Sequence, residues 1–270
     1  IDEEDKDVML LNHLPISFSQ PKFSGFRLSY QSSEQLKSLR KRLANTHFVM
    51  RVGDHVALFP YEHGTQTEGE AITFDTTDDH SVANALKAAG AADVAITADP
   101  ATVRAAERIV LPGVGSFKAC AEGLRACAGL EEALAERVLG AGVPFLGICV
   151  GMQLLATQGV EHGVTPGLGW VPGEVRLIEP ADASIKVPHM GWNDVVAHAD
   201  APLVASGEAY FLHSYHFAAD DPGHVLATTR HGAELAAAVG RGNIVGTQFH
   251  PEKSQAFGLA LLSRFLEWRP

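Results

Sequence analysis

The segment VPFLGICVGMQLL, residues 143–155, carries the pattern on which our prediction of the fold rests. Val143 to Ile148 is a short apolar run, which is typical of a strand buried on both faces. The run leads through Gly147-Ile148-Cys149-Val150-Gly151 into a helix-compatible segment, Met152 to Ala156. A nucleophile flanked by small residues between strand and helix is the thiol version of the nucleophile elbow. We therefore predict a central buried strand that ends at Cys149.

An elbow at this place would both expose Cys149 and activate it. Glycines permit the sharp backbone turn, and the N-terminus of the following helix carries a partial positive charge that favours the thiolate. The alternative interpretation is a buried, inert cysteine, which is the commonest environment of a free thiol.

A second segment supplies the partners that a catalytic thiol requires. Ile244 to Phe249 predicts another buried strand, which runs directly into His250-Pro251-Glu252-Lys253. The proline favours extended backbone at the residue before it, and in an extended chain residues two apart point to the same side. His250 is then placed to act as a base whose tautomer Glu252 holds. A solvated His-Pro-Glu turn is the alternative, and the elbow at Cys149 argues against it.

Five motifs together resemble a known family. GICVGMQ (147–153) and QFHPEKS (248–254) resemble the pattern of class I, triad-type glutamine amidotransferases. LPGVGSF (111–117), PHMGWN (188–193) and YFLHSYHF (210–217) narrow the resemblance to the glutaminase subunit of imidazole glycerol phosphate synthase, from histidine biosynthesis. The resemblance covers about residues 80–270. It implies an α/β fold with an open, mostly parallel, flavodoxin-like sheet and helices on both faces.

The resemblance implies a reaction and a set of site residues. Cys149, His250 and Glu252 would hydrolyse glutamine to glutamate and ammonia without a cofactor. Ammonia would pass to a cyclase subunit, the partner in a heterodimer that forms imidazole glycerol phosphate and AICAR. Backbone N–H groups of Val114 and Val150 would stabilise the oxyanion, and Lys253 and Trp192 would lie at the partner interface. The implied glutamine pocket consists of Gly113, Gln153, Glu161, His213, Ser214 and Tyr215. Glu161 has independent support, because the ammonium of free glutamine requires a carboxylate.

Two other functions are compatible with part of the pattern. The glutaminase of anthranilate or aminodeoxychorismate synthesis usually has G-H-Q where this chain has Gly151-Met152-Gln153, which disfavours it. An inactive, triad-bearing binding scaffold is the second. It is suggested by residues 72–79, ITFDTTDD, which lack the glycines and asparagine of the family's D-Y-G-x-G-N loop.

Composition excludes several other classes of function. The formal net charge of −11 and the absence of a broad basic face argue against nucleic-acid binding. No apolar run approaches the roughly 20 residues of a membrane span, and the acidic N-terminus does not resemble a signal peptide. The three cysteines form neither a metal-binding nor a disulfide framework. We therefore expect a cytoplasmic protein with no bound metal.

Residues 1–68 lie outside the resemblance, and we expect them to be a small α+β extension of unknown function. Its predicted parts are a strand at 26–30, a helix at 33–43 and a hairpin formed by 48–51 and 55–59. A polar linker at 61–70 would lead into the glutamine amidotransferase domain, residues 69–270.

Within that domain, strands and helices alternate, which predicts a parallel sheet covered on both faces. The predicted strands are 71–74, at the edge of the sheet, then 94–96, 109–111 and the central strand. Helices are predicted around 82–89, 100–107, 117–128 and 131–139, and Asp99 is predicted to cap the second of them. From residue 174 onward short strands predominate, until a last helix at 256–268.

Overall fold

The computed structural model describes residues 79–270, apart from 181, 183 and 200, and in addition six short strands within the first 75 residues. The chain divides into two compact units, Ile1–Thr76 and Thr77–Pro270. The strands of the first unit are β1 (Met9–Leu10), β2 (Ser17–Phe18), β3 (Gly25–Ser29), β4 (His47–Val52), β5 (His55–Pro60) and β6 (Ile72–Asp75).

In the first unit two predicted elements are confirmed, and a third, the strand at 71–74, has a different pairing partner from the one expected. The predicted hairpin is present as β4 and β5, and the predicted strand at 26–30 is β3. Strand β6 pairs with β3 in antiparallel orientation, so the expectation that 71–74 forms the edge of the parallel sheet is wrong. The predicted helix at 33–43 and the linker at 61–70 lie outside the described residues.

The second unit contains the elements that build the α/β fold. Its helices are α2 (Asp79–Ala88), α3 (Pro100–Ala105), α4 (Phe117–Ala126), α5 (Leu130–Ala135), α6 (Val150–Gln153) and α7 (Gln255–Glu267), with the short turns η2 (Glu136–Gly140), η3 (Pro222–His224) and η4 (Pro251–Lys253). Its strands are β7 (Ile109–Gly113), β8 (Phe145–Cys149), β9 (Gln158–Gly159), β10 (Thr165–Pro166), β11 (Gly173–Leu177), β12 (His189–Ala197), β13 (Gly207–His213), β14 (Tyr215–Ala219), β15 (Val225–Arg230), β16 (Glu234–Arg241) and β17 (Ile244–Thr247). None of the described helices is long and apolar enough to cross a lipid bilayer.

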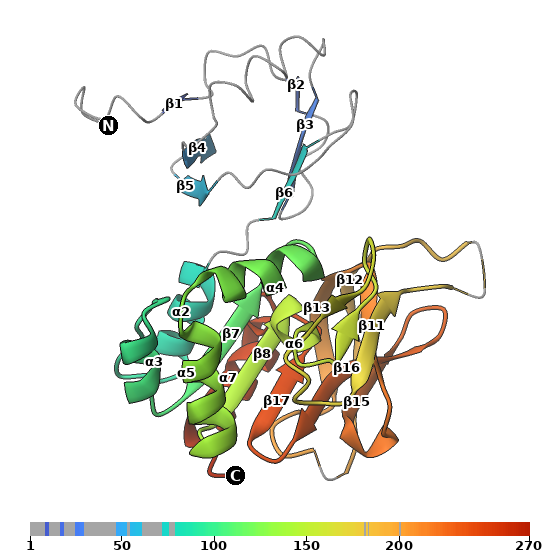
Figure 1. Cartoon of the computed structure of the whole chain (residues 1–270). Coiled ribbons are helices and arrows are strands. Elements are labelled where there is room, and N and C mark those ends of the chain that lie inside the picture. Colours follow the sequence, from blue (N-terminus) through green and yellow to red (C-terminus); the bar gives the residue numbers. More distant parts are fainter. Residues whose placement is uncertain are drawn as a thin grey trace. The chain divides into compact units, whose positions relative to one another are not determined.

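A seven-stranded sheet runs through this unit in the order β13-β12-β15-β16-β17-β8-β7 (Figure 1). Its pairs are parallel at β7–β8 and β8–β17, and antiparallel from β17 to β13. The α/β class is therefore confirmed, but the sheet is mixed rather than mostly parallel. For β15–β16 and β16–β17 the reason is a connection of only three and two residues, since a short turn between neighbouring strands permits only antiparallel pairing.

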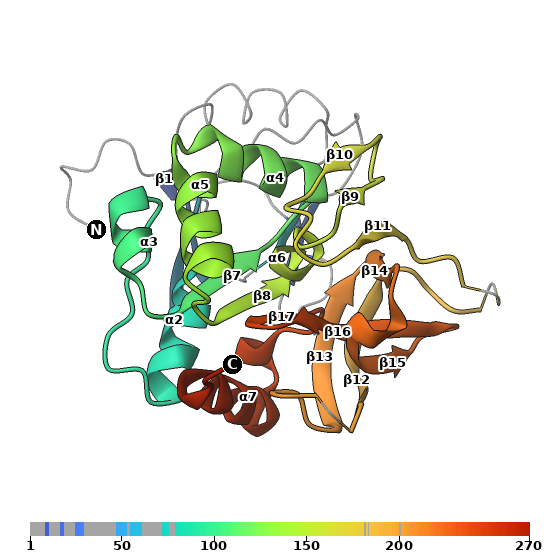
Figure 2. The same cartoon turned by 60° about the horizontal axis from the view of Figure 1, so that its bottom comes forward.

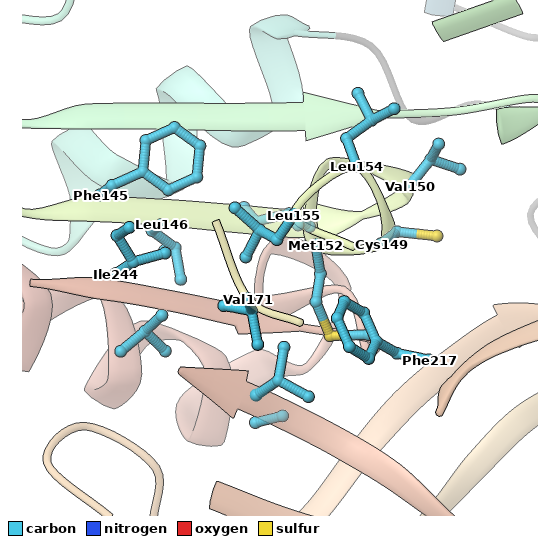
Figure 3. Close-up of a cluster of buried hydrophobic side chains, with 14 of the residues drawn as sticks. Phe145, Leu146, Cys149, Val150, Met152, Leu154, Leu155, Val171, Phe217 and Ile244 are labelled. Carbon is cyan, nitrogen blue, oxygen red and sulfur yellow. The ribbon is translucent and has the colours of Figure 1, made fainter. Parts of the chain in front are cut away.

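Helices cover both faces of the parallel part of the sheet, as predicted. Helices α4 and α5 lie on one side of β7, β8 and β17, and α2 and α7 lie together on the other (Figure 2). Strand β8 is buried along its whole length, because it lies between two parallel strands and beneath both helical layers. Figure 3 shows the apolar cluster around it, to which Phe145, Leu146 and Ile244 contribute.

Local capping and burial explain where the other predicted elements are right and where they are wrong. Asp99 caps α3 as predicted, because its carboxylate accepts hydrogen bonds from the N–H groups of Ala101 and Thr102 at 3.3 and 2.9 Å. Residues 94–96 form no strand; Ile96 is 49% exposed, so the three-residue apolar run is not a buried element. The helix predicted over 152–156 is only the single turn α6.

We predict that a chain lacking residues 1–68 retains the folded α/β unit, because Thr77–Pro270 is a compact unit of its own. Circular dichroism and thermal unfolding of the truncated chain, compared with the full chain, test this. An unfolded product would show that the extension completes the core and that the predicted boundary at residue 68 is wrong.

Candidate active site

Cys149 occupies a strained backbone conformation at the end of β8. Its φ and ψ are 54° and −111°, a region that residues with a side chain seldom adopt. Glycines on either side allow neighbouring backbone to approach: a Cβ at Gly151 would overlap the carbonyl of Leu111, and one at Gly147 would lie 2.6 Å from the Gly151 oxygen. The sulfur points away from the apolar cluster that anchors the strand (Figure 3). The predicted elbow is therefore present, but the expected exposure is wrong, because Cys149 is buried with 5% of its surface accessible.

The topology brings His250 to the same edge of the sheet as Cys149. Strands β8 and β17 are parallel neighbours with Ile148 opposite Thr247, so the residues that follow each strand emerge together. His250 Nδ1 lies 2.8 Å from Glu252 Oε1, and both side chains are 1% exposed. Because a carboxylate only accepts hydrogen bonds, Nδ1 carries the proton and Nε2 is the nitrogen left for other chemistry.

The contact between His250 and Glu252 arises differently from the way the sequence suggested. Pro251–Lys253 forms the 3₁₀ turn η4 with His250 as its N-cap, whereas extended chain was expected. The N-cap residue itself is extended, with φ −96° and ψ 101°, which agrees with the effect of the following proline. The turn then carries Glu252 back under the ring.

Electrostatics favours the charged form of His250. Burial lowers its pKa, but attraction to Cys149, a polar contact with that sulfur and the bond to Glu252 together outweigh burial and raise the pKa to about 10. Nε2 is buried and has no hydrogen bond of standard geometry to any described residue. The attraction between the His250 ring and the sulfur therefore does not depend on a well-aligned hydrogen bond between them.

Gln248 is a site residue that the sequence analysis missed. It is fully buried, and its Nε2 donates to the Cys149 sulfur at 3.7 Å. Its Oε1 accepts from Gln153 Nε2 at 3.0 Å, and Gln153 Nε2 also donates to the carbonyl of Tyr215 at 3.0 Å. The signal in the sequence was a polar amide inside an otherwise apolar strand, directly before Phe249 and His250.

The two predicted oxyanion residues leave the sheet side by side. Gly113 and Cys149 are register partners at the ends of β7 and β8, so Val114 and Val150 follow them at one edge. A Cβ at Gly113 would lie 2.7 Å from the Gly151 nitrogen, which explains why this position lacks a side chain. Val114 is 41% exposed.

Three of the residues predicted to bind glutamine, Gln153, His213 and Ser214, lie next to Tyr215. His213 Nδ1 lies 2.9 Å from the Tyr215 carbonyl, which Gln153 also contacts. Burial and then the negative charge of Glu161 raise the pKa of the Tyr215 hydroxyl. Ser214 lies in the bend between β13 and β14, where its carbonyl accepts from Ile178 N at 2.9 Å.

One oxygen of the Glu161 carboxylate is already engaged within the protein. Its Oε2 accepts a hydrogen bond from the Phe117 N–H at 2.8 Å, at the N-terminus of α4. This bond fixes the carboxylate and leaves Oε1 for a ligand. No group of three or more metal-ligating side chains occurs in the part of the chain that the structure describes.

The two predicted interface residues meet at Tyr210, which the sequence analysis did not single out. Lys253 Nζ lies over the Tyr210 ring, 5.8 Å from its centroid. Trp192 stands edge-on to the same ring with centroids 6.3 Å apart, and it is 49% exposed. The Tyr210 carbonyl also accepts a hydrogen bond from the His250 N–H at 2.9 Å, so Tyr210 is joined to the backbone of His250.

Comparison with known proteins agrees with this geometry. The family model "Glutamine amidotransferase class-I" matches residues 69–267. The chain belongs to that family. A solved glutamine amidotransferase with 23% sequence identity shares its fold, with a TM-score of 0.57 over 71% of this chain and 93% of that one.

Two curated relatives carry the name imidazole glycerol phosphate synthase subunit HisH. The protein from Zymomonas mobilis is 57% identical over 193 residues, which are 70% of this chain and 91% of the relative. The protein from Rhodospirillum rubrum is 50% identical over 209 residues, 74% of this chain and 98% of the relative. This class I amidotransferase is thus similar to HisH proteins over nearly their whole length.

We predict that Cys149→Ser lowers the pKa of His250 well below 10. The serine hydroxyl is neutral, so the attraction that raises this pKa is lost, while burial continues to lower it. NMR titration of ¹⁵N-labelled histidine side chains measures the change, with Cys127→Ser as the matched control. An unchanged titration of His250 in Cys149→Ser would show that the sulfur does not stabilise the imidazolium.

The raised pKa of His250 also contributes to the free energy of unfolding of the unaltered chain. Because the pKa of His250 in the folded chain lies above its unfolded value of about 6.5, this stabilising contribution is complete below that pH. The contribution decreases as the pH rises from there toward 10.

Proposed function

We propose that this protein is the glutaminase subunit of an imidazole glycerol phosphate synthase, which hydrolyses glutamine and delivers ammonia to a cyclase subunit in histidine biosynthesis. The observation that carries the proposal is the convergence of Cys149 on its strained elbow with the buried pair of His250 and Glu252. The identity to HisH proteins supports the choice of this subunit among class I amidotransferases. Because the reaction uses free glutamine, the proposal places the enzyme in the cytoplasm.

In the proposed mechanism, the Cys149 thiolate attacks the side-chain amide carbon of glutamine, and the electron pair of the C=O bond moves to oxygen. The His250 imidazolium gives its Nε2 proton to the amide nitrogen, and ammonia leaves as the thioester forms. His250 then takes a proton from water, which attacks the thioester and releases glutamate and the thiolate. Glu252 holds the Nδ1–H tautomer through both steps.

The backbone supplies the proposed oxyanion site. The N–H of Val150 follows the nucleophile, and the N–H of Val114 lies in the adjacent glycine-rich loop after β7. Each such donor contributes about 3 kcal/mol to stabilising a developing oxyanion in comparable sites. The contacts of Gly113 with α6 support this assignment, because they keep the two loops at backbone distance.

The proposed glutamine pocket uses one charged group and several polar ones. The free oxygen of Glu161 would bind the α-ammonium of glutamine. Gln153 and the bend at 213–215 would bind the remaining polar groups of the substrate. The hydrogen bonds that converge on the Tyr215 carbonyl support this placement, because they hold the bend against α6.

We further propose that the cyclase subunit docks on the face formed by Trp192, Tyr210 and Lys253. Trp192 and nearby Met190 are 49% and 53% exposed, and large exposed apolar groups with a flanking charge are typical of protein interfaces. The backbone bond from His250 to Tyr210 gives this face a direct structural connection to the triad. Residues 1–68 lie outside the family match, and we propose that they are an appended extension without a chemical role.

We predict that Cys149→Ala lowers glutamine hydrolysis by at least about a thousandfold, because the nucleophile is lost, while the fold remains intact. A steady-state glutaminase assay with a cyclase subunit present measures the rate, and circular dichroism checks folding. Cys127→Ala is the control and should keep full activity. Activity that persists in Cys149→Ala would refute the catalytic assignment.

We also predict that Lys253→Ala reduces stimulation by the cyclase subunit about tenfold or more, with a smaller effect on unstimulated hydrolysis. The reason is that Lys253 contacts Tyr210 on the proposed docking face, where loss of a charge weakens coupling. Lys118→Ala is the matched control, because Lys118 forms only an exposed pair with Glu122 on α4. Equal losses in both activities would instead place Lys253 in the triad's own function.

A further inference from the structure

Two buried histidines face each other across β12 and β13. His189 and His213 are register partners in this antiparallel pair, and they are 3% and 6% exposed. His189 Nδ1 lies 2.9 Å from His213 Nε2. Opposed imidazoles at this distance share one proton, so the tautomer of one ring determines that of the other.

The neighbouring groups determine which tautomers are present. The Tyr215 carbonyl only accepts, so His213 Nδ1 must carry the proton that bridges the 2.9 Å to it. In a neutral ring His213 Nε2 is then an acceptor, and His189 Nδ1 must be the donor. His189 Nε2 is left as the acceptor of the Asn193 Nδ2 amide at 3.0 Å. Both rings are therefore Nδ1–H tautomers.

Asn193 is held in the orientation that this pattern needs. Its Nδ2 also donates to the Arg230 carbonyl at 3.0 Å, and its Oδ1 accepts from the Asp194 N–H at 2.8 Å. If the Asn193 amide were reversed, its oxygen would face the Arg230 carbonyl and its nitrogen would face the Asp194 N–H, so neither hydrogen bond could form. The direction of hydrogen bonding thus runs from Asn193 through both histidines to Tyr215.

Aromatic contacts fix the plane of the first ring. Phe211 stacks on His189 with centroids 4.6 Å apart and planes at 20°. His231 also stacks on it, at 4.2 Å and 19°, and is itself tied to the Lys186 carbonyl through Nε2 at 2.8 Å. With its plane constrained by two stacked rings, His189 has one direction in which to donate.

The chain of hydrogen bonds ends at the proposed glutamine site. The Tyr215 carbonyl receives His213 Nδ1–H and also Gln153 Nε2–H. Gln153 in turn contacts Gln248, whose amide reaches the Cys149 sulfur. A change in the tautomer or orientation of the His213 ring therefore alters its hydrogen bond to the Tyr215 carbonyl, and Gln153 donates to that same carbonyl.

We propose that His189, oriented by Asn193, is a positioning residue for glutamine binding: it sets the tautomer and orientation of His213, and through it the bend at 213–215 and Gln153. The inference rests on the proposed function. His189 does not contact the reacting atoms in this arrangement; it acts through His213.

A charged ring would break the pattern. An imidazolium at either position carries N–H on both nitrogens, so two donors would face each other somewhere in the chain. Burial agrees with this, since it lowers the pKa of His189 to about 4 and that of His213 to about 3. The network is therefore complete only when both rings are neutral.

The first test is spectroscopic and does not depend on activity. Long-range ¹H–¹⁵N spectra of the full chain with labelled histidine distinguish the two tautomers of each ring. We expect Nδ1–H for His189 and His213 at neutral pH. An Nε2–H tautomer at His189 would overturn the proposal.

The second test compares two substitutions in the full chain with a cyclase subunit present. His189→Asn keeps an amide donor at the place of Nδ1, whereas His189→Leu removes it. We expect His189→Leu to raise the KM for glutamine roughly tenfold with kcat changed less than about twofold. His189→Asn should restore most of the affinity.

His198→Leu is the matched control, because it replaces an exposed histidine just after β12, outside this network, and should leave KM unchanged. Equal KM values in His189→Leu and the unaltered chain would overturn the proposal, as would equal losses of kcat in His189→Leu and His189→Asn. If His189→Leu does not fold, the tautomers and the KM of His189→Asn still decide the matter. If the unaltered chain has no glutaminase activity at all, the proposed function fails, while the tautomer measurement still judges the network.

Discussion

The site depends on the close approach of three pieces of backbone at the ends of β7 and β8. Gly113, Gly147 and Gly151 lack side chains where a Cβ would meet neighbouring backbone, and this packing supports the unfavourable φ of Cys149. A strained conformation persists only where its surroundings over-determine it. Here the surroundings are a strand buried on both faces and the short helix α6, so the stability of the core is what holds Cys149 in this conformation.

Much of the fold could be predicted because its signals are local. The apolar run 143–148, the cap at Asp99 and the glycines around Cys149 each act within a few residues of chain. Sheet direction is different, because it depends on which distant strands become neighbours. The pairing of β6 with β3 and the antiparallel part of the large sheet could not be derived from periodicity, which is the same for both orientations.

The proposed triad residues could be named from the sequence, since a nucleophile elbow and a His-Pro-Glu segment have distinctive residue types. Residues that act through buried hydrogen bonds were harder to find. Gln248 and His189 are ordinary polar residues in the sequence, and only the register of β8 with β17 and of β12 with β13 shows their partners. Tyr210 was missed for a similar reason, because an aromatic residue in a strand is more often part of the core.

The short turn η4 has a consequence for how such a site is adjusted. Because His250 and Glu252 belong to one turn and are bonded to each other, they move as a single body, and their mutual geometry is not a variable. Cys149 belongs to a separate strand. The geometry of the proposed triad then depends mainly on how the end of β8 lies beside the end of β17, and the parallel register of these two strands sets that placement.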